Sequence, residues 1–220
     1  MGVVLEFQVH DALNKYLVAK KLPPRASKKF ITQIAMGMLY LADKRVIHRD
    51  LAGRNVLVHT PDQCKISDFS LAKILGHETE YYRTEQRGLW PIKWYAPECL
   101  YSNTFTTYSD VWSFGVTMWE VASSGKTPYP GMKGRQVLEF IEKGNRLKIH
   151  PKIIEHEPWM QPVKSIDFLN PSRFLWGFVF WRARVGSARY TVAGVPDATH
   201  QRVLATAAVR VAVCSGTKIC

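Results

Sequence analysis

The clearest alternation of hydrophobic and polar positions in this sequence covers residues 28–43 and predicts a helix. Apolar side chains recur there every three or four positions: Phe30, Ile34, Met38 and Leu41, with Ile31 and Ala35 beside them. Ser27 is a residue type that caps helix N-termini, so we expect the helix to begin just after it. A shorter amphipathic turn is predicted around Leu13, Tyr16 and Leu17, and two prolines separate it from the helix.

Two more helices and some short strands are predicted further along the chain. The first helix covers 109–122, with Ser109 as its cap, and the second covers about 135–143 and ends before a glycine. Brief β elements are expected at 46–47, 56–58 and 65–67. Residues 76–88 are polar and rich in turn-forming types, which predicts an exposed, mobile loop. After Pro158 the periodicity degrades and predicts no element.

Composition indicates an ordinary globular chain. The sequence has 220 residues, 46% of them hydrophobic, which is enough for one domain with a buried core. Its four cysteines are scattered without a C-x-x-C pair, so we expect no disulfide framework or zinc site and favour a reducing compartment. The apolar start is short and lacks a basic region, so no signal peptide is predicted. No apolar run approaches the roughly 20 residues of a membrane-spanning helix.

The net charge of +12 is unevenly distributed. Residues 1–157 hold 22 Lys and Arg against 16 Asp and Glu, whereas residues 158–220 hold 8 against 2. A basic excess can indicate nucleic acid or an anionic membrane as a partner. The basic residues after 158 are dispersed and form no stripe, so we interpret the excess as an acid-poor composition and expect no nucleic-acid partner.

The richest chemistry lies in His48-Arg49-Asp50-Leu51-Ala52-Gly53-Arg54-Asn55. This stretch matches the H-R-D-L-x-x-x-N loop, in which a carboxylate faces a substrate hydroxyl and an amide oxygen five residues later faces a metal ion. Asp68-Phe69-Ser70 and Ala96-Pro97-Glu98 follow in the order of the same signature set. Because the motifs occur together, we interpret Asp50 as a catalytic base rather than an ordinary loop aspartate.

Asn55 and Asp68 are the candidate metal ligands. Magnesium binds hard oxygen atoms and completes its shell with phosphates and water, so one amide and one carboxylate are sufficient. Ser70 replaces the glycine of the D-F-G pattern, and glycine permits backbone torsions that serine adopts only at a cost. The carboxylate of Asp68 is unchanged, so metal binding is compatible with Ser70. Two alternatives stay open for Ser70: it alters the conformational switching of the loop that follows, or it has no effect.

The neighbours of Asp50 have competing interpretations. His48 and Phe69 are expected to be packing residues rather than chemical groups. Arg49 precedes a loop that contains Tyr81 and Tyr82, so it is either a partner for phosphotyrosine or a solvated arginine.

Two acidic residues further along are also ambiguous. Glu98 is expected to be structural and needs a cationic partner if it is buried. Asp110 either favours the N-terminus of its helix or, by resemblance to proteins that carry the signature set above, braces the backbone of the 48–55 loop.

These motifs resemble eukaryotic protein kinases, and specifically tyrosine kinases. The segments that carry the resemblance are Leu51–Asn55, Pro91–Glu98 and Ser109–Gly115. Within that group the chain most resembles the spleen tyrosine kinase (Syk) family of non-receptor kinases. The supporting segments are Asn14–Leu17, Met36–Met38, Lys65–Phe69, Tyr81-Tyr82, Trp94–Cys99 and Gly131–Gly134. Janus kinases share some of them and come second. The resemblance covers roughly residues 5–148.

The resemblance implies a mainly α fold, the C-terminal lobe of a protein kinase with short β hairpins around the catalytic loop. Residues 1–150 are expected to be this partial kinase domain, beginning at the hinge, and 151–220 a tail unlike kinases and poorly ordered. We expect the amino-terminal lobe to be absent, because the sequence has no G-x-G-x-x-G loop and no V-A-I-K lysine. The tail also lacks an R-P-x-F segment, whose arginine, by the resemblance, would pair with Glu98. A truncated or mis-spliced kinase reading would explain both ends.

The implied activity is transfer of the ATP γ-phosphoryl group to protein tyrosine in cytoplasmic signalling, with Mg²⁺ and ATP as cofactors. The resemblance implies these residue roles: Asp50 as base, Arg54 orienting substrate, Asn55 and Asp68 as metal ligands, Asn55, Asp68 and Leu57 contacting ATP, Lys93 and Trp94 docking substrate, and Tyr81 and Tyr82 as phosphorylation sites. No transmembrane segment is expected. The alternatives are a catalytically inactive lobe that acts as an interaction fragment, or a fragment of a Janus-type or receptor tyrosine kinase.

Overall fold

A computed structural model describes residues 10–20, 24–85, 88 and 90–148. Its helices are α1 (Leu13–Ala19), α2 (Pro24–Asp43), α3 (Pro97–Ser102), α4 (Thr107–Ala122) and α5 (Gly134–Glu142), with short 3-10 helices η1 (Gly53–Asn55) and η2 (Ile92–Trp94). Its antiparallel strand pairs are β1 (Val46–Ile47) with β4 (Lys73–Ile74), β2 (Val56–Thr60) with β3 (Gln63–Ile66), and β5 (Tyr82–Arg83) with β6 (Thr104–Phe105). The predicted mainly helical fold with short strand pairs is confirmed. The expected hinge and the 151–220 tail lie outside the described residues.

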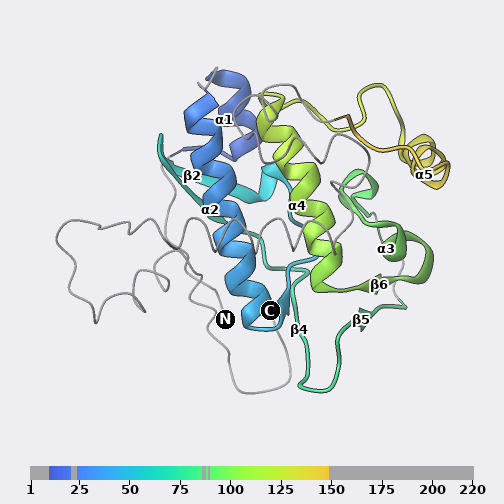
Figure 1. The fold of residues 1–220 in the computed structure, drawn as a ribbon. Coiled ribbons are helices and arrows are strands. Elements are labelled where there is room, and N and C mark those ends of the chain that lie inside the picture. The colour runs from blue at the N-terminus through green and yellow to red at the C-terminus, as the bar shows by residue number, and fades with distance from the viewer. Residues whose placement is uncertain (1–9, 21–23, 86–87, 89, 149–220) are drawn as a thin grey trace, which may run out of the picture.

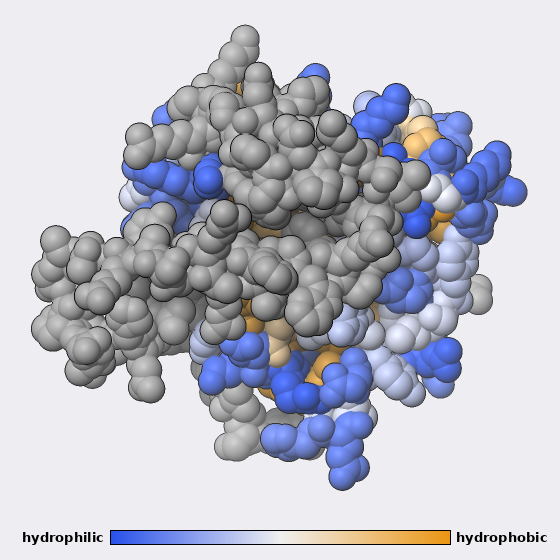
Figure 2. Space-filling view, viewed as in Figure 1, coloured by the Kyte–Doolittle hydropathy of each residue, from blue (hydrophilic) through white to orange (hydrophobic). Residues whose placement is uncertain are grey.

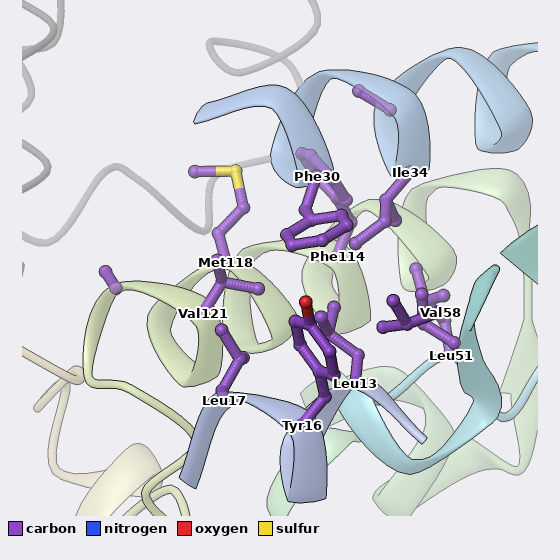
Figure 3. Close-up of a cluster of buried hydrophobic side chains, with 13 residues drawn as sticks. Leu13, Tyr16, Leu17, Phe30, Ile34, Leu51, Val58, Phe114, Met118 and Val121 are labelled. Carbon is purple, nitrogen blue, oxygen red and sulfur yellow. The ribbon is translucent and has the colours of Figure 1, made fainter. Parts of the chain in front are cut away.

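The first core cluster lies between α1, α2 and α4, which pack against one another on one side of the molecule (Figure 1). Figure 3 shows its side chains pointing toward one another from α1 (Leu13, Tyr16, Leu17), α2 (Phe30, Ile34) and α4 (Phe114, Met118, Val121). Leu51 and Val58 enter the same cluster from the 48–55 loop and from β2. Burying each such side chain contributes about 1.5–3 kcal/mol, so the core also anchors the loop.

The second core cluster lies on the other side of α4. Trp112 and Val116 of α4 pack there with residues that come before and after the helix: Tyr95, Cys99, Phe105, Tyr129, Val137 and Ile141. Helix α4 is therefore buried along most of its length, and its polar residues Asp110 and Glu120 are held inside the protein. Both acidic side chains come close to the 48–55 loop as a result.

The helix starts differ from the predicted ones. Helix α2 begins at Pro24, and proline is favoured at the first helical position because it has no N–H to leave unpaired there. Ser27 therefore lies inside the helix and does not cap it. Helix α4 begins at Thr107, capped by Thr106, whose hydroxyl accepts the N–H of Ser109 at 3.1 Å, while the Ser109 hydroxyl accepts the N–H of Thr106 at 3.0 Å. The two form a reciprocal capping box.

The exposed loop predicted over 76–88 is largely solvent-exposed where it is described, but it contains strand β5. This strand pairs with β6, in the register Tyr82 with Phe105 and Arg83 with Thr104. On the face drawn in Figure 2, hydrophilic residues form most of the described surface in view. Within the described residues, no helix is both long and apolar enough to cross a membrane.

Candidate active site

The backbone of the 48–55 loop is held by Asp110 from the first turns of α4. Its carboxylate accepts the N–H of His48 at 2.7 Å and the N–H of Arg49 at 3.0 Å. Arg49 has a φ of 70°, a left-handed conformation that is unfavourable for a branched or long side chain and persists only when neighbouring bonds hold it. Asp110 is 4% exposed, and its pKa is raised to about 7, because the effect of burial outweighs the opposite effect of the two N–H groups. Of its two interpretations, bracing the loop is the one that the structure supports.

His48 is a packing residue, as predicted. Its ring lies 4.8 Å from that of Phe69 and is fully buried, which lowers its pKa and keeps it neutral. Nδ1 accepts the N–H of Asp50 at 3.2 Å, so Nε2 carries the hydrogen and donates it to the carbonyl oxygen of Ser67 at 3.1 Å. The imidazole thus connects the 48–55 loop to the segment that leads into Asp68.

The structure brings Asp50, Arg54 and Asn55 together. One carboxylate oxygen of Asp50 forms an ion pair with the guanidinium of Arg54, and the other accepts a hydrogen bond from the Asn55 amide at 2.7 Å. The same amide nitrogen also donates to the carbonyl oxygen of Asp50 at 2.7 Å. Each carboxylate oxygen can accept a second hydrogen, so the fixed carboxylate can still take a proton.

Asn55 and Asp68 have oxygen atoms that fit a hard divalent cation. Because the Asn55 side-chain nitrogen donates to Asp50, its Oδ1 points elsewhere, and no hydrogen bond to that oxygen is formed within the described part of the chain. Ser67 donates both its N–H and its hydroxyl to the carbonyl oxygen of Asn55, at 2.8 and 2.9 Å. These bonds hold Asp68, the next residue, beside Asn55, and its carboxylate is exposed. An amide and a carboxylate are a donor set that suits Mg²⁺.

Of the two predicted docking residues, Trp94 lies against the same loop and Lys93 contacts a different segment. The guanidinium of Arg54 lies 4.7 Å from the ring centre of Trp94 in η2, a cation–π contact. Lys93 is used internally, since its ammonium donates to the carbonyl oxygens of Pro128 and Tyr129 at 2.9 and 3.3 Å. Leu57, the other residue expected to contact ATP, is half-buried in β2 opposite Lys65.

Glu120, which no sequence motif indicated, connects the docking segment to the loop. Its Oε2 accepts both the N–H of Gly53 at 2.8 Å and the indole N–H of Trp94 at 2.9 Å. Glu120 is almost completely buried in α4, and burial raises its pKa. A glutamate inside the otherwise apolar Met118–Ala122 segment was the available signal, because a buried carboxylate requires donors.

The two adjacent tyrosines lie in different surroundings. Tyr81 is 56% exposed, whereas Tyr82 is half-buried. The guanidinium of Arg49 lies 4.7 Å from the ring of Tyr82 and 4.2 Å from the ring of Phe105, and the ammonium of Lys73 lies 5.2 Å from the Tyr82 ring. Arg49 is 8% exposed, so its interpretation as a solvated arginine is wrong.

Glu98 is half-buried in α3. It forms no ion pair with any residue that the structure describes, and burial raises its pKa. A half-buried carboxylate is the case in which a cationic partner was expected for Glu98, and residues 10–20, 24–85, 88 and 90–148 do not supply one.

Comparison with known proteins agrees with this geometry. A family model described as protein tyrosine and serine/threonine kinase matches residues 1–159. The chain is 47% identical over 152 residues to the mouse tyrosine-protein kinase ZAP-70, an overlap of 68% of this chain and 25% of that protein. The chain belongs to the protein tyrosine kinase family. This kinase chain is also 46% identical over 147 residues to the chicken tyrosine-protein kinase SYK, covering 66% of the chain and 24% of that protein.

Receptor proteins are similar to this kinase chain as well. It is 48% identical over 144 residues to the honeybee epidermal growth factor receptor, covering 66% of the chain and 11% of that protein. The kinase chain spans about a quarter of the length of ZAP-70 and SYK, which it matches over two-thirds of its own residues. The resemblance to spleen-type tyrosine kinases inferred from the motifs is confirmed.

Proposed function

We propose that this chain supplies the catalytic-loop side of a protein-tyrosine kinase active site, the C-terminal lobe that binds the acceptor tyrosine. The carboxylate of Asp50 carries the proposal, because Arg54 and Asn55 fix it and Asp110 holds the loop beneath it. A base that must meet one hydroxyl benefits from such fixation, since positioning supplies much of the catalysis in phosphoryl transfer.

In the proposed reaction, Asp50 accepts the proton of the substrate tyrosine hydroxyl as that oxygen bonds to the γ-phosphorus of ATP, the bond from this phosphorus to the β–γ bridging oxygen breaks, and ADP leaves. Asn55 Oδ1 and the carboxylate of Asp68 would hold Mg²⁺, which neutralises phosphate charge when it is bound. Arg54, between Asp50 and Trp94, would orient the peptide backbone near the acceptor tyrosine. Trp94 would shape the docking surface, and Lys93 would support it indirectly by holding the 128–129 turn. Leu57 would contact the nucleotide, and Tyr81 and Tyr82 would be sites of phosphorylation.

The proposal extends to the organisation of the chain. We assign residues 1–150 to the kinase unit, supported by the family match over 1–159, and 151–220 to a separate tail. We also propose a cytoplasmic, non-receptor kinase. The similarity to ZAP-70 and SYK supports this, as do the free thiols of Cys64 and Cys99.

A second candidate function is a non-catalytic interaction module. The 220 residues contain no G-x-G-x-x-G loop and no V-A-I-K lysine, the groups that cover and neutralise the phosphates. We therefore expect the 220-residue polypeptide by itself to show little or no phosphotransfer to a tyrosine peptide. Asp50-dependent incorporation of labelled phosphate by this polypeptide would contradict that expectation.

A segment exchange tests the catalytic proposal directly. The segment of mouse ZAP-70 that matches this chain is replaced by residues 1–150, and phosphorylation of a tyrosine peptide is measured. We expect an active chimera, and Asp50→Asn should lower kcat by about 10²–10⁴, the usual contribution of a general base. Glu139→Gln, at an exposed position on α5, is the matched control. A folded chimera without activity would favour the interaction module.

A further inference from the structure

Ser70, at the position where tyrosine kinases are expected to carry glycine, does not use the conformational freedom of glycine. Within Asp68-Phe69-Ser70, the residue with a positive φ is Asp68, at 59°, and Ser70 is not in the left-handed region. Aspartate enters that region more readily than most residues. Serine at position 70 is therefore compatible with the observed backbone, and its side chain is free to act elsewhere.

The Ser70 side chain contacts the carboxylate of Asp68. Its hydroxyl donates a hydrogen bond to Oδ1 of Asp68 at 2.6 Å, and its N–H approaches the same oxygen at 3.3 Å. Both donors act on one oxygen, so Oδ2 receives no hydrogen bond from any residue that the structure describes. The carboxylate therefore has one oxygen held by Ser70 and one oxygen that is available to a ligand.

The residues on both sides of Asp68 are held independently. Ser67 is bonded twice to Asn55, and Phe69 packs against the buried ring of His48. Asp68 itself is exposed, so apart from Ser70 its side chain would turn freely in solvent. The backbone thus places Asp68 near Asn55, and Ser70 decides which way the carboxylate points.

We propose that Ser70 is a positioning residue that orients Asp68 for a divalent cation held jointly with Asn55. The idea rests on the proposed function, which makes Asp68 a metal ligand. Hydrogen bonds that orient a ligating carboxylate typically change metal affinity 10–100-fold when they are removed. In this chain a serine hydroxyl supplies that bond, from a position where glycine could not.

Binding of Mn²⁺ to the 220-residue chain tests the role without any activity measurement. Mn²⁺ is a hard cation with a paramagnetic signal, so water-proton relaxation reports its dissociation constant directly. The variants are Ser70→Ala, Ser70→Gly, Ser70→Thr and Asp68→Asn, with Thr127→Ala as a matched control at another exposed hydroxyl. Circular dichroism checks that each variant has the wild-type helix content.

We expect Ser70→Ala and Ser70→Gly to weaken Mn²⁺ binding by about tenfold, the lower end of the range because the site is exposed. Ser70→Thr keeps the hydroxyl and should bind as the wild type does, and so should Thr127→Ala. An unchanged or tighter dissociation constant in Ser70→Ala, while Asp68→Asn loses binding, overturns the role of Ser70 alone. If Asp68→Asn binds as the wild type does, Asp68 is not a ligand, and the metal role in the proposed function falls with it.

Discussion

The contacts of Glu120 make a sharp prediction about two substitutions of one residue. The N–H of Gly53 and the indole N–H of Trp94 both point at Oε2 and not at Oε1. Glutamine can place its carbonyl oxygen at the Oε2 position and keep both hydrogen bonds, with its amide nitrogen where Oε1 lies now. Alanine removes the acceptor of two donors at once.

The expected losses of unfolding free energy differ accordingly. A hydrogen bond to a charged acceptor contributes about 1.5–3 kcal/mol, so Glu120→Ala, which removes two of them, should lose about 3–6 kcal/mol of unfolding free energy. Glu120→Gln should lose about 1 kcal/mol, because neutral hydrogen bonds replace charged ones. Urea unfolding of the 220-residue chain, followed by circular dichroism, measures both. Glu139→Gln on the exposed face of α5 is the control, and loss of its exposed pair with Arg135 should change stability by less than about 1 kcal/mol.

The pH dependence provides a second measurement on the same variants. Burial raises the pKa of Glu120 in the folded state above its value in the unfolded chain. The folded state therefore binds the proton more tightly, and stability from this group falls as the pH rises through the folded pKa. Glu120→Gln removes that dependence, so the difference in unfolding free energy between the wild type and Glu120→Gln should shrink from acidic to neutral pH. If Glu120→Gln destabilises as much as Glu120→Ala, the two donors do not share one oxygen and the reasoning is wrong.

Three further predictions concern α4 and the loop beside it. Asp110→Asn should lower the unfolding free energy by about 2–4 kcal/mol, because the amide nitrogen of Asn would face one of the two loop N–H groups, donor against donor. Burial raises the pKa of Asp110 from 3.8 to about 7, so the wild type loses stability across that pH range and the difference in unfolding free energy between wild type and variant should narrow. Urea unfolding in buffers of rising pH measures that difference. Thr106→Ala should lose about 1 kcal/mol by removing the cap of α4, and a thermal melt unchanged from wild type would contradict the capping box. In the wild type, an added tyrosine kinase should phosphorylate the exposed Tyr81 before Tyr82. Arg49→Met should reduce the difference in phosphorylation rate between the two tyrosines, because it removes the guanidinium that covers the Tyr82 ring. Mass spectrometry over a time course reports the order.

Local patterns predict most of the helices correctly, but not where they begin. Amphipathic spacing is a property of neighbouring residues, so the periodic apolar positions of 28–43 mark α2. The helix predicted over 109–122 from a capping residue type corresponds to α4, which is apolar on more than one face because it is buried between the two core clusters. The starts depend on which of several suitable caps is used. Pro24 and Thr106 prevail over Ser27 and Ser109, because proline suits the first helical position and Thr106 forms a reciprocal pair with Ser109.

Long-range pairing explains what the local patterns do not predict. Strands β5 and β6 have two residues each, too few for an alternating pattern, and form only because residues 82–83 and 104–105 meet in space. The contact between Arg49 and Tyr82 depends on the same pairing. Glu120 meets Gly53 across 67 positions of sequence, so no local spacing could predict that bond.

Local motifs are enough to identify the residues of the candidate chemistry and the family, because Asp50, Arg54 and Asn55 lie within one short loop whose spacing brings them together. How that loop is held depends instead on long-range packing. Helix α4 is buried between two core clusters, and burial forces Asp110 and Glu120 to find donors. The donors that meet them are three backbone N–H groups of the loop, with the indole N–H of Trp94 as a fourth. The physical need to satisfy two buried carboxylates thus fixes the position of the proposed base.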